Sequence, residues 1–202
     1  MIELPKGVKH WPAYFDRTAQ ENLLQTIRDG VREAPLFTPR MPKTGKEMTV
    51  RMTNFGELGW VTDKERGYRY QDTHPQTGMP WPAMPQAFLD LWDALADHRR
   101  PPQAALINWY ADDAKMGLHQ DRDEADLSAP VLSISLGNEC LFRVGGIKRT
   151  DKTQSFRLCS GDVMMLSDEA RLAFHGVDRI YADTSDLLKA GGRINVTLRR
   201  VN

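Results

Sequence analysis

The chain has 202 residues, of which 41% are hydrophobic and 27% charged, and its formal net charge is zero. This size and composition predict one globular domain with a substantial core and exclude a largely disordered chain. No apolar run approaches the ~18 residues that span a bilayer, and the start MIELPKGVKHW lacks the apolar core of a signal peptide. We therefore expect a cytoplasmic protein with no membrane partner.

The neutral net charge excludes a surface that is basic throughout, but it leaves room for local contacts with phosphates. Residues 40–51 and the C-terminal RINVTLRRVN are candidates, and for each alone a solvated surface is the simpler interpretation. Cys140 and Cys159 lack the C-x-x-C spacing, which favours two reduced thiols.

The first half of the chain predicts helices. Residues 18–35 form an amphipathic pattern that starts with the capping-box spacing of Thr18 and Glu21. The Pro-rich residues 73–85 predict an ordered loop. Apolar side chains at helical spacing then predict a second helix over residues 86–99.

The second half predicts strands. After Pro102 the chain consists of short β-branched or alternating runs, separated by Gly, Asp, Asn or Pro. Many short strands at this spacing are typical of a sandwich, barrel or jelly roll. We expect an α+β fold with its helices first and a double-sheet β domain after them, in which residues 183–192 form a loop insertion. The predicted strands lie in AALINWY, VLSISLG, CLFRVG, SFRLC, DVMMLS, ARLAFHGV and RINVTLRRV.

A metal site is the first functional hypothesis. His119 and Asp121 are two positions apart, so on an extended segment both point to the same face. A lone H-x-D is weak evidence, and a third ligand is needed. His175 lies on a predicted strand, where Gly176 permits close approach of another backbone. The remaining histidines are expected at the surface: His10, His74 and His98.

Two imidazoles and one carboxylate that hold one face of an octahedron are typical of non-haem Fe(II) oxygenases. A structural zinc would more often close four positions with thiolates, and neither cysteine is suitably spaced. The alternative is a strand histidine whose ring is satisfied by ordinary hydrogen bonds, and the spacing alone does not decide between the two.

The last predicted strand adds a second signal, because Arg193, Asn195, Thr197 and Arg199 share one of its faces. Such a face would ordinarily meet water. If it faced the interior, the two guanidinium groups would need anionic partners, and a dicarboxylate would satisfy both. Asn108 and Tyr110, again two apart, could offer an amide and a phenol to the same ligand.

These residues together resemble the AlkB-type nucleic-acid dealkylating dioxygenases, which use Fe(II) and 2-oxoglutarate. The match runs from about residue 38 and is densest in NWYADDAKMGLHQDRDE, GDVMML, ARLAFHGV and RINVTLR, while TNFGELGW, GYRY and PWPAMP are similar to the nucleotide-recognition lid of the bacterial DNA-repair branch. The resemblance implies a double-stranded β-helix, or jelly roll, with N-terminal helices and that lid. It implies one catalytic domain over residues 1–202, with the helices and lid in about 1–100 and the jelly-roll core in about 101–202.

The resemblance also implies roles for individual residues. The iron ligands would be His119, Asp121 and His175. The residues that bind 2-oxoglutarate would be Asn108, Tyr110, Arg193, Asn195 and Arg199. Of the arginines, Arg193 is favoured for the distal carboxylate and Arg199 for the keto-acid end.

The implied reaction is oxidative demethylation of bases such as 1-methyladenine and 3-methylcytosine, coupled to conversion of 2-oxoglutarate and O₂ to succinate and CO₂, with release of formaldehyde. We expect a monomer that acts on alkylated DNA, with RNA as the second candidate. Two alternatives stay open: a 2-oxoglutarate-dependent hydroxylase of a protein or small molecule, and a non-catalytic jelly-roll binding module.

A cationic methylated base calls for aromatic faces and a carboxylate in its pocket. Trp60 is the candidate for stacking, Tyr68 for contact with phosphate or base, and Asp123 for an exocyclic amine. Met52 and Arg149 are further candidates for the pocket. For Trp60 and Met52 the alternative is ordinary core packing.

Overall fold

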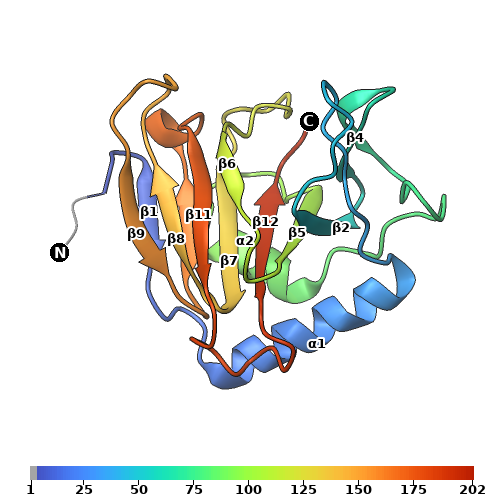
Figure 1. Cartoon of the computed structure of the whole chain (residues 1–202), viewed down its shortest axis with the longest axis horizontal. Helices are drawn as coiled ribbons and strands as arrows, with labels where there is room; N and C mark the ends of the chain where they lie inside the picture. The colour runs from blue at the N-terminus through green and yellow to red at the C-terminus, as the bar shows by residue number, and fades with distance from the viewer. Residues whose placement is uncertain (1–3) are drawn as a thin grey trace.

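The computed structural model describes residues 4–202 as a sandwich of two β-sheets with two helices on one outer face (Figure 1). The larger sheet has six strands in the order β1-β10-β7-β12-β5-β2, the smaller has four in the order β6-β11-β8-β9, and β3 and β4 form a separate hairpin. The helices are α1 (Arg17–Glu33) and α2 (Gln86–Leu95). The strands are β1 (Val8–Trp11), β2 (Val50–Gly56), β3 (Gly59–Asp63), β4 (Gly67–Gln71), β5 (Ala104–Tyr110), β6 (Met116–His119), β7 (Val131–Gly137), β8 (Glu139–Val144), β9 (Gln154–Leu158), β10 (Val163–Leu166), β11 (His175–Tyr181) and β12 (Arg193–Arg199).

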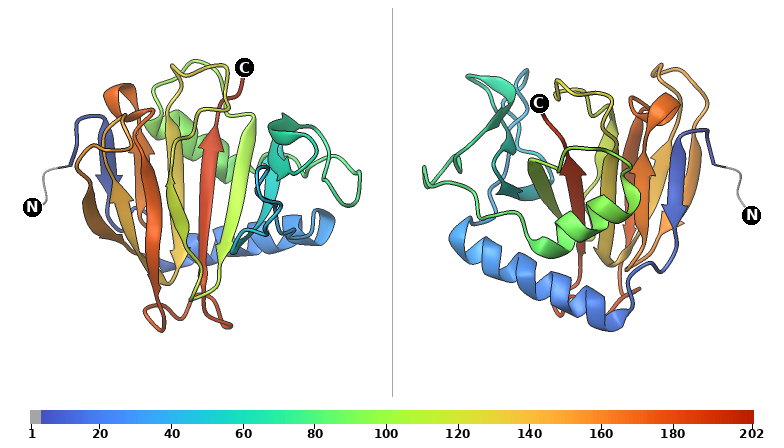
Figure 2. Two further views of the ribbon diagram at one scale, coloured as in Figure 1. Left: turned by 45° about the horizontal axis from the view of Figure 1, so that its top comes forward. Right: turned by 180° about the vertical axis from the view of Figure 1, so that it is seen from behind.

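The outer face of the larger sheet is covered by α1 and α2, as the view from behind shows (Figure 2). Apolar residues of both helices pack there against Ile107 of β5 and Val196 of β12. Gly30 of α1 is required by this packing, because a Cβ atom there would lie 2.0 Å from the ring of Phe55 in β2. The helices thus bury the apolar side of the sheet and leave its other side for the sandwich interior.

The inner face of the larger sheet meets the smaller sheet. Its residues alternate with those under the helices, as the period of two requires. The predicted polar row on β12 therefore points into the sandwich interior, and Arg193 and Arg199 are both buried. The alternative in which this row meets water is wrong.

The jelly-roll class is confirmed, but several boundaries differ from expectation. The larger sheet takes in β1 and β2, so the strands of the sandwich are not confined to residues 101–202. The first helix is capped by Asp16, whose side chain accepts a hydrogen bond from the Ala19 amide, and not by Thr18. The second helix ends at Leu95, short of residue 99, because Asp97 takes a positive φ just beyond it.

The predicted strand in ARLAFHGV also differs. Strand β11 begins only at His175, while residues 168–170 form a 3-10 turn and the chain up to Phe174 is irregular. Among the described residues, no helix has the length and apolar character needed to cross a membrane.

Candidate metal and co-substrate site

The three predicted metal ligands lie close together in the structure. One ligand atom each from His119, Asp121 and His175 lies within 4.8 Å of the others. The Nε2 atoms of both histidines are 3.7 Å from the Asp121 carboxylate oxygens, and the two imidazole centroids are 4.4 Å apart. This spacing fits three ligands of one ion and leaves one side of the site to other ligands.

The backbone brings these residues together by strand pairing. His119 at the end of β6 lies directly opposite His175 at the start of β11. The approach is close, because a Cβ atom at Gly176 would lie 2.5 Å from the carbonyl oxygen of Met116. The expectation that Gly176 permits close backbone approach is confirmed.

The tautomer of both rings suits metal binding. The Nδ1 atom of His119 lies 3.0 Å from the Gly117 carbonyl oxygen, and that of His175 lies 2.9 Å from the Ala173 carbonyl oxygen. A carbonyl only accepts hydrogen bonds, so Nδ1 carries the proton in each ring. Each Nε2 lone pair is therefore free and faces Asp121.

The charge states of His175 and Asp121 also suit metal binding. Burial, together with nearby His119, lowers the pKa of His175 to about 4, so this imidazole is neutral at physiological pH. Burial alone would raise the pKa of Asp121, but Arg199 and the two imidazoles outweigh it and hold the pKa well below its usual range. The site thus offers a neutral imidazole at His175 and an ionised carboxylate at Asp121, which are the ionisation states that a divalent metal needs.

A row of polar groups on β12 and β5 extends from this triad into the sandwich. Arg199 Nη2 donates to Asp121 Oδ1 at 2.8 Å, which places Arg199 at the metal end. Arg193 is at the opposite end of β12, where its Nη2 donates to the Ser135 hydroxyl at 2.7 Å. Tyr110 lies directly across from Arg193 on β5, and its hydroxyl stays protonated because burial raises its pKa.

This row contains buried polar atoms that lack a partner. Within residues 4–202, no hydrogen bond reaches Asn108 Oδ1, Arg193 Nε or Arg199 Nε. Buried polar groups are rarely left in this state, so each indicates a ligand. A dicarboxylate with an oxygen at each end can accept hydrogen bonds from the two guanidinium groups, whereas Asn108 Oδ1 itself only accepts and calls for a donor. Asn195 differs, because its amide donates to the Ile134 carbonyl and accepts from Thr197.

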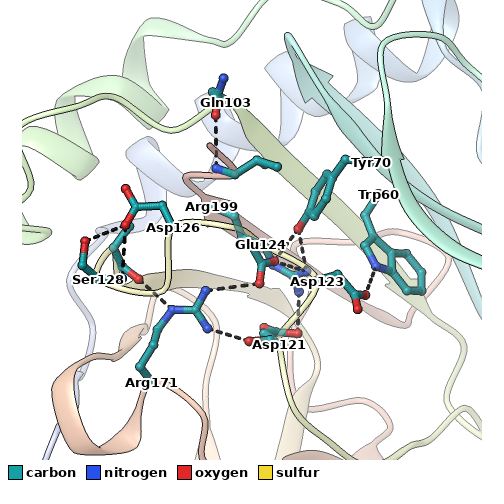
Figure 3. Close-up of polar contacts among 12 residues, drawn as sticks. Trp60, Tyr70, Gln103, Asp121, Asp123, Glu124, Asp126, Ser128, Arg171 and Arg199 are labelled. Atoms are coloured by element: carbon teal, nitrogen blue, oxygen red, sulfur yellow. Dashed lines mark hydrogen bonds and ion pairs between the residues drawn. The ribbon is translucent and has the colours of Figure 1, made fainter.

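Arg199 also belongs to a buried ion network (Figure 3). Its Nη1 donates to Glu124 Oε1 at 3.2 Å and to the Tyr70 hydroxyl at 3.1 Å, and Tyr70 in turn donates to Glu124. Burial raises the pKa of Tyr70, which keeps its hydroxyl protonated, while Asp121, Tyr70 and Glu124 raise the pKa of Arg199 against its own burial. The β3–β4 hairpin is thereby tied to the triad.

The predicted substrate contacts gather on the same hairpin. The Trp60 indole nitrogen donates to Asp123 Oδ2 at 2.8 Å, as Figure 3 shows. Trp60 also stacks on Tyr68, with centroids 5.6 Å apart and planes inclined by 22°. Tyr68 is 49% exposed, so this pair presents aromatic surface beside the triad to a ligand from solvent.

The two remaining candidates are placed differently. Met52 is buried in the core cluster behind the triad, so the alternative of ordinary core packing describes it. Arg149 donates to the Leu118 carbonyl at 3.0 Å and lies over the Phe174 ring. It therefore braces the strand that carries His119.

Sequence reasoning missed four residues that connect the segment carrying Asp121 to the rest of the fold. Glu124 and Gln120 lie on this segment, and Tyr70 and Arg171 bond to it. The expectation that His74 lies at the surface was also wrong, whereas His10 and His98 are partly exposed. His74 is 1% exposed and its ring is held by the Pro35 carbonyl and two backbone amides. The rings of the other two lie beside carboxylates, His10 by Asp162 and His98 by Asp126.

Comparisons with known proteins agree with this geometry. Residues 7–199 match the family model described as the 2OG-Fe(II) oxygenase superfamily. The chain is 55% identical to the alpha-ketoglutarate-dependent dioxygenase AlkB homolog of Caulobacter vibrioides, over 96% of this chain and 87% of the relative. It is 42% identical to AlkB of Escherichia coli, over 92% of this chain and 87% of the relative.

The chain is also similar to a more distant relative and to a solved structure. The chain is 28% identical to the tRNA demethylase abh1 of Schizosaccharomyces pombe, over 98% of this chain and 66% of the relative. Its structure is similar to that of OsALKBH1, with a TM-score of 0.81 and 28% identity, over 98% of this chain and 99% of the other. The chain therefore belongs to the AlkB-type dioxygenases of the 2OG-Fe(II) oxygenase superfamily, which use Fe(II) and 2-oxoglutarate.

Proposed function

We propose that this protein removes alkyl groups from nucleic-acid bases by oxidation, with 1-methyladenine and 3-methylcytosine in DNA as its substrates. The observation that carries the proposal is the position of the Trp60–Asp123 pair beside a triad whose polar row suits a dicarboxylate. One chain supplies every one of these groups, so we assign the activity to a monomer, and we place it in the cytoplasm.

The residue roles follow from the contacts. We assign His119, Asp121 and His175 as the ligands of Fe(II), because one ligand atom of each converges on a common point and the Nε2 lone pairs of both imidazoles are free. The bound iron and 2-oxoglutarate supply the oxidation, in which one oxygen atom of O₂ enters succinate and the other hydroxylates the N-alkyl carbon, which then leaves as formaldehyde.

For 2-oxoglutarate we assign Arg199 to the keto-acid end, since it bonds to Asp121, and Arg193 to the distal carboxylate. Asn108 lies between these ends, opposite Asn195, and the protonated hydroxyl of Tyr110 belongs to the residue opposite Arg193, at the distal end. The amide of Asn195 is already hydrogen-bonded within the larger sheet. We therefore expect Asn195 to shape the 2-oxoglutarate pocket more than to bind the carboxylates strongly.

The substrate class rests on charge and exposure. Methylation at N1 of adenine or N3 of cytosine makes the base cationic and blocks its pairing edge, which lowers the cost of flipping it out of a duplex. Trp60 and Tyr68 offer aromatic faces to this cation, and Asp123 offers a carboxylate to its exocyclic amine. RNA is the second candidate, and the similarity to the tRNA demethylase of Schizosaccharomyces pombe is the observation that favours it.

The test is a mass measurement. The protein is incubated with Fe(II), 2-oxoglutarate and an oligonucleotide that carries 1-methyladenine or 3-methylcytosine, and the oligonucleotide is then weighed by mass spectrometry. Repair removes the mass of one CH₂ group per lesion. An unchanged mass alongside strong succinate release would instead support hydroxylation of a protein or a small molecule.

The chain offers a matched control for the metal assignment. His119→Ala should abolish succinate formation, whereas His10→Ala removes another histidine that lies beside a carboxylate, far along the chain from the triad, and should leave it intact. If His119→Ala retained succinate formation, the ligand assignment would be wrong.

A further inference from the structure

The segment that carries Asp121 has no regular structure of its own. Residues 120–130 join β6 to β7 without a helix or a strand, yet Asp121, Glu124 and Ala129 are all buried. Backbone pairing ends at His119, where β6 meets His175 of β11. Other contacts must therefore fix the Asp121 carboxylate relative to the two imidazoles.

Arg199 pairs with the carboxylate itself, and Arg171 holds the backbone of the segment (Figure 3). The Arg171 side chain is 4% exposed, and three of its guanidinium nitrogens bond to the segment. Nη1 donates to the Asp121 carbonyl at 2.6 Å, Nε donates to the Ala129 carbonyl at 2.6 Å, and Nη2 donates to Glu124 Oε2 at 3.2 Å. One side chain thus holds the beginning, middle and end of residues 121–129.

The position of Arg171 along the chain gives these bonds their effect. It follows the 3-10 turn Asp168–Ala170 and lies four residues before His175. The bonds therefore join the segment that carries Asp121 to the segment that leads into His175. Gln120 makes the reverse connection, because its amide donates to the Leu172 carbonyl at 2.6 Å and to the Ile147 carbonyl at 3.2 Å.

We propose that Arg171, supported by Gln120, is a positioning residue that sets the metal affinity of the triad by fixing Asp121 against His175. The inference rests on the proposed assignment of the three ligands. A planar guanidinium group can donate in three directions at once, which a lysine ammonium group on a single flexible stem cannot reproduce. Partners of this kind typically change metal affinity by about 10- to 100-fold when they are removed.

The test measures metal affinity without turnover. The metal-free protein is titrated with Co(II) under anaerobic conditions, and the visible absorption of the bound ion gives both the affinity and the ligand geometry. Arg171→Lys should weaken binding by about 10- to 100-fold and alter the absorption spectrum, since Asp121 is no longer held in place. Gln120→Leu should show the same change to a smaller extent.

Arg143→Met is the matched control. Arg143 bonds to Asp178 in the same small sheet, and in the described part of the chain it makes no bond to residues 119–129. The Co(II) affinity and absorption spectrum of the Arg143→Met variant should therefore equal those of the parent. Circular dichroism melting of each metal-free variant shows that it is folded. If Arg171→Lys does not fold, Gln120→Leu decides the question.

The outcomes separate two failures. If the parent does not bind Co(II), or if His119→Ala binds it equally well, the ligand assignment itself fails. If the parent binds through the triad but Arg171→Lys and Gln120→Leu keep its affinity and spectrum, the positioning role is overturned. Equal loss in Arg143→Met would also overturn it, because general destabilisation would then account for the effect.

Discussion

Arg199 is the side chain whose loss should most change the stability of the metal-free protein. Its guanidinium group lies between the carboxylates of Asp121 and Glu124, and all three side chains are at most 7% exposed. Arg199→Met keeps much of the aliphatic volume but leaves two buried carboxylates with Arg171 as their remaining cation nearby. Removal of one partner of a buried ion pair typically costs about 3–5 kcal/mol.

The magnitude is consistent with simple electrostatics. Two opposite charges about 4 Å apart attract by about 4 kcal/mol at an effective dielectric constant near 20. For a domain of this size, each 1 kcal/mol lowers the melting temperature by about 2–4 °C, so we expect a fall of about 6–20 °C. Urea unfolding of the metal-free protein, followed by circular dichroism at pH 7, measures the free energy of unfolding directly.

The pH dependence provides a second check with a definite sign. In the parent, the pKa of Asp121 is held below its usual range, so this group stabilises the fold at pH values above the unfolded pKa and loses that contribution in acid. In Arg199→Met the largest of the groups that offset this burial is lost, so the pKa of the carboxylate rises. The stability deficit should therefore be largest at neutral pH and should narrow as the pH falls toward 4.

A surface variant controls for loss of any arginine. Arg157→Met breaks an ion pair with Glu139 in which the arginine side chain is 54% exposed, and it should cost at most about 1 kcal/mol. The reasoning is refuted if Arg199→Met matches Arg157→Met at pH 7, or if its deficit is independent of pH.

Three further predictions follow from the site. Arg193→Met should raise the 2-oxoglutarate concentration for half-maximal turnover by about 10- to 100-fold, because a charge-assisted bond is lost. The affinity for the oligonucleotide, measured by fluorescence titration, should stay unchanged. Equal loss of affinity for both would contradict the assigned role. Trp60→Ala should weaken binding of a methylated oligonucleotide by about 1–3 kcal/mol without changing Co(II) affinity, and retained oligonucleotide binding would remove Trp60 from the pocket. Hydrogen bonds from Ser128 and the nearby Arg100 lower the pKa of Asp126 to about 2. Asp126→Asn should therefore lower the free energy of unfolding by about 1 kcal/mol at pH 6, and this loss should shrink as the pH falls below 4. A loss that persisted when urea unfolding is measured in acid would contradict this.

The sequence predicted the parts of the fold that depend on periodicity. Strand β12 is an example, because its alternation of apolar and polar residues reports directly which side faces the helices and which faces the interior. The same period of two placed Asn108 and Tyr110 on one face of β5. These local rules hold because each strand is packed on both sides.

Other features depend on contacts between distant parts of the chain and leave little local trace. Residues 170–174 read as a strand from their apolar composition, but Arg171 turns toward residues 121–129 and the backbone follows an irregular path. Likewise, His74 in the Pro-rich loop looked like a surface residue, yet the Pro35 carbonyl and the loop's own amides satisfy its ring and allow burial. In each case at least one partner lies too far away in the sequence to be read from it: residues 121–129 for Arg171 and Pro35 for His74.

The central place of β12 has a consequence for synthesis of the protein on the ribosome. This strand is hydrogen-bonded to β7 on one side and to β5 on the other, so among residues 4–202 it is the one strand that connects β1-β10-β7 with β5-β2 in the larger sheet. Until residues 193–199 have emerged, the nascent chain holds two separate pieces of sheet with exposed edges that invite wrong pairing. Assembly must therefore wait for translation to pass residue 199, and messages truncated upstream of β12 should yield products that chaperones and proteases clear.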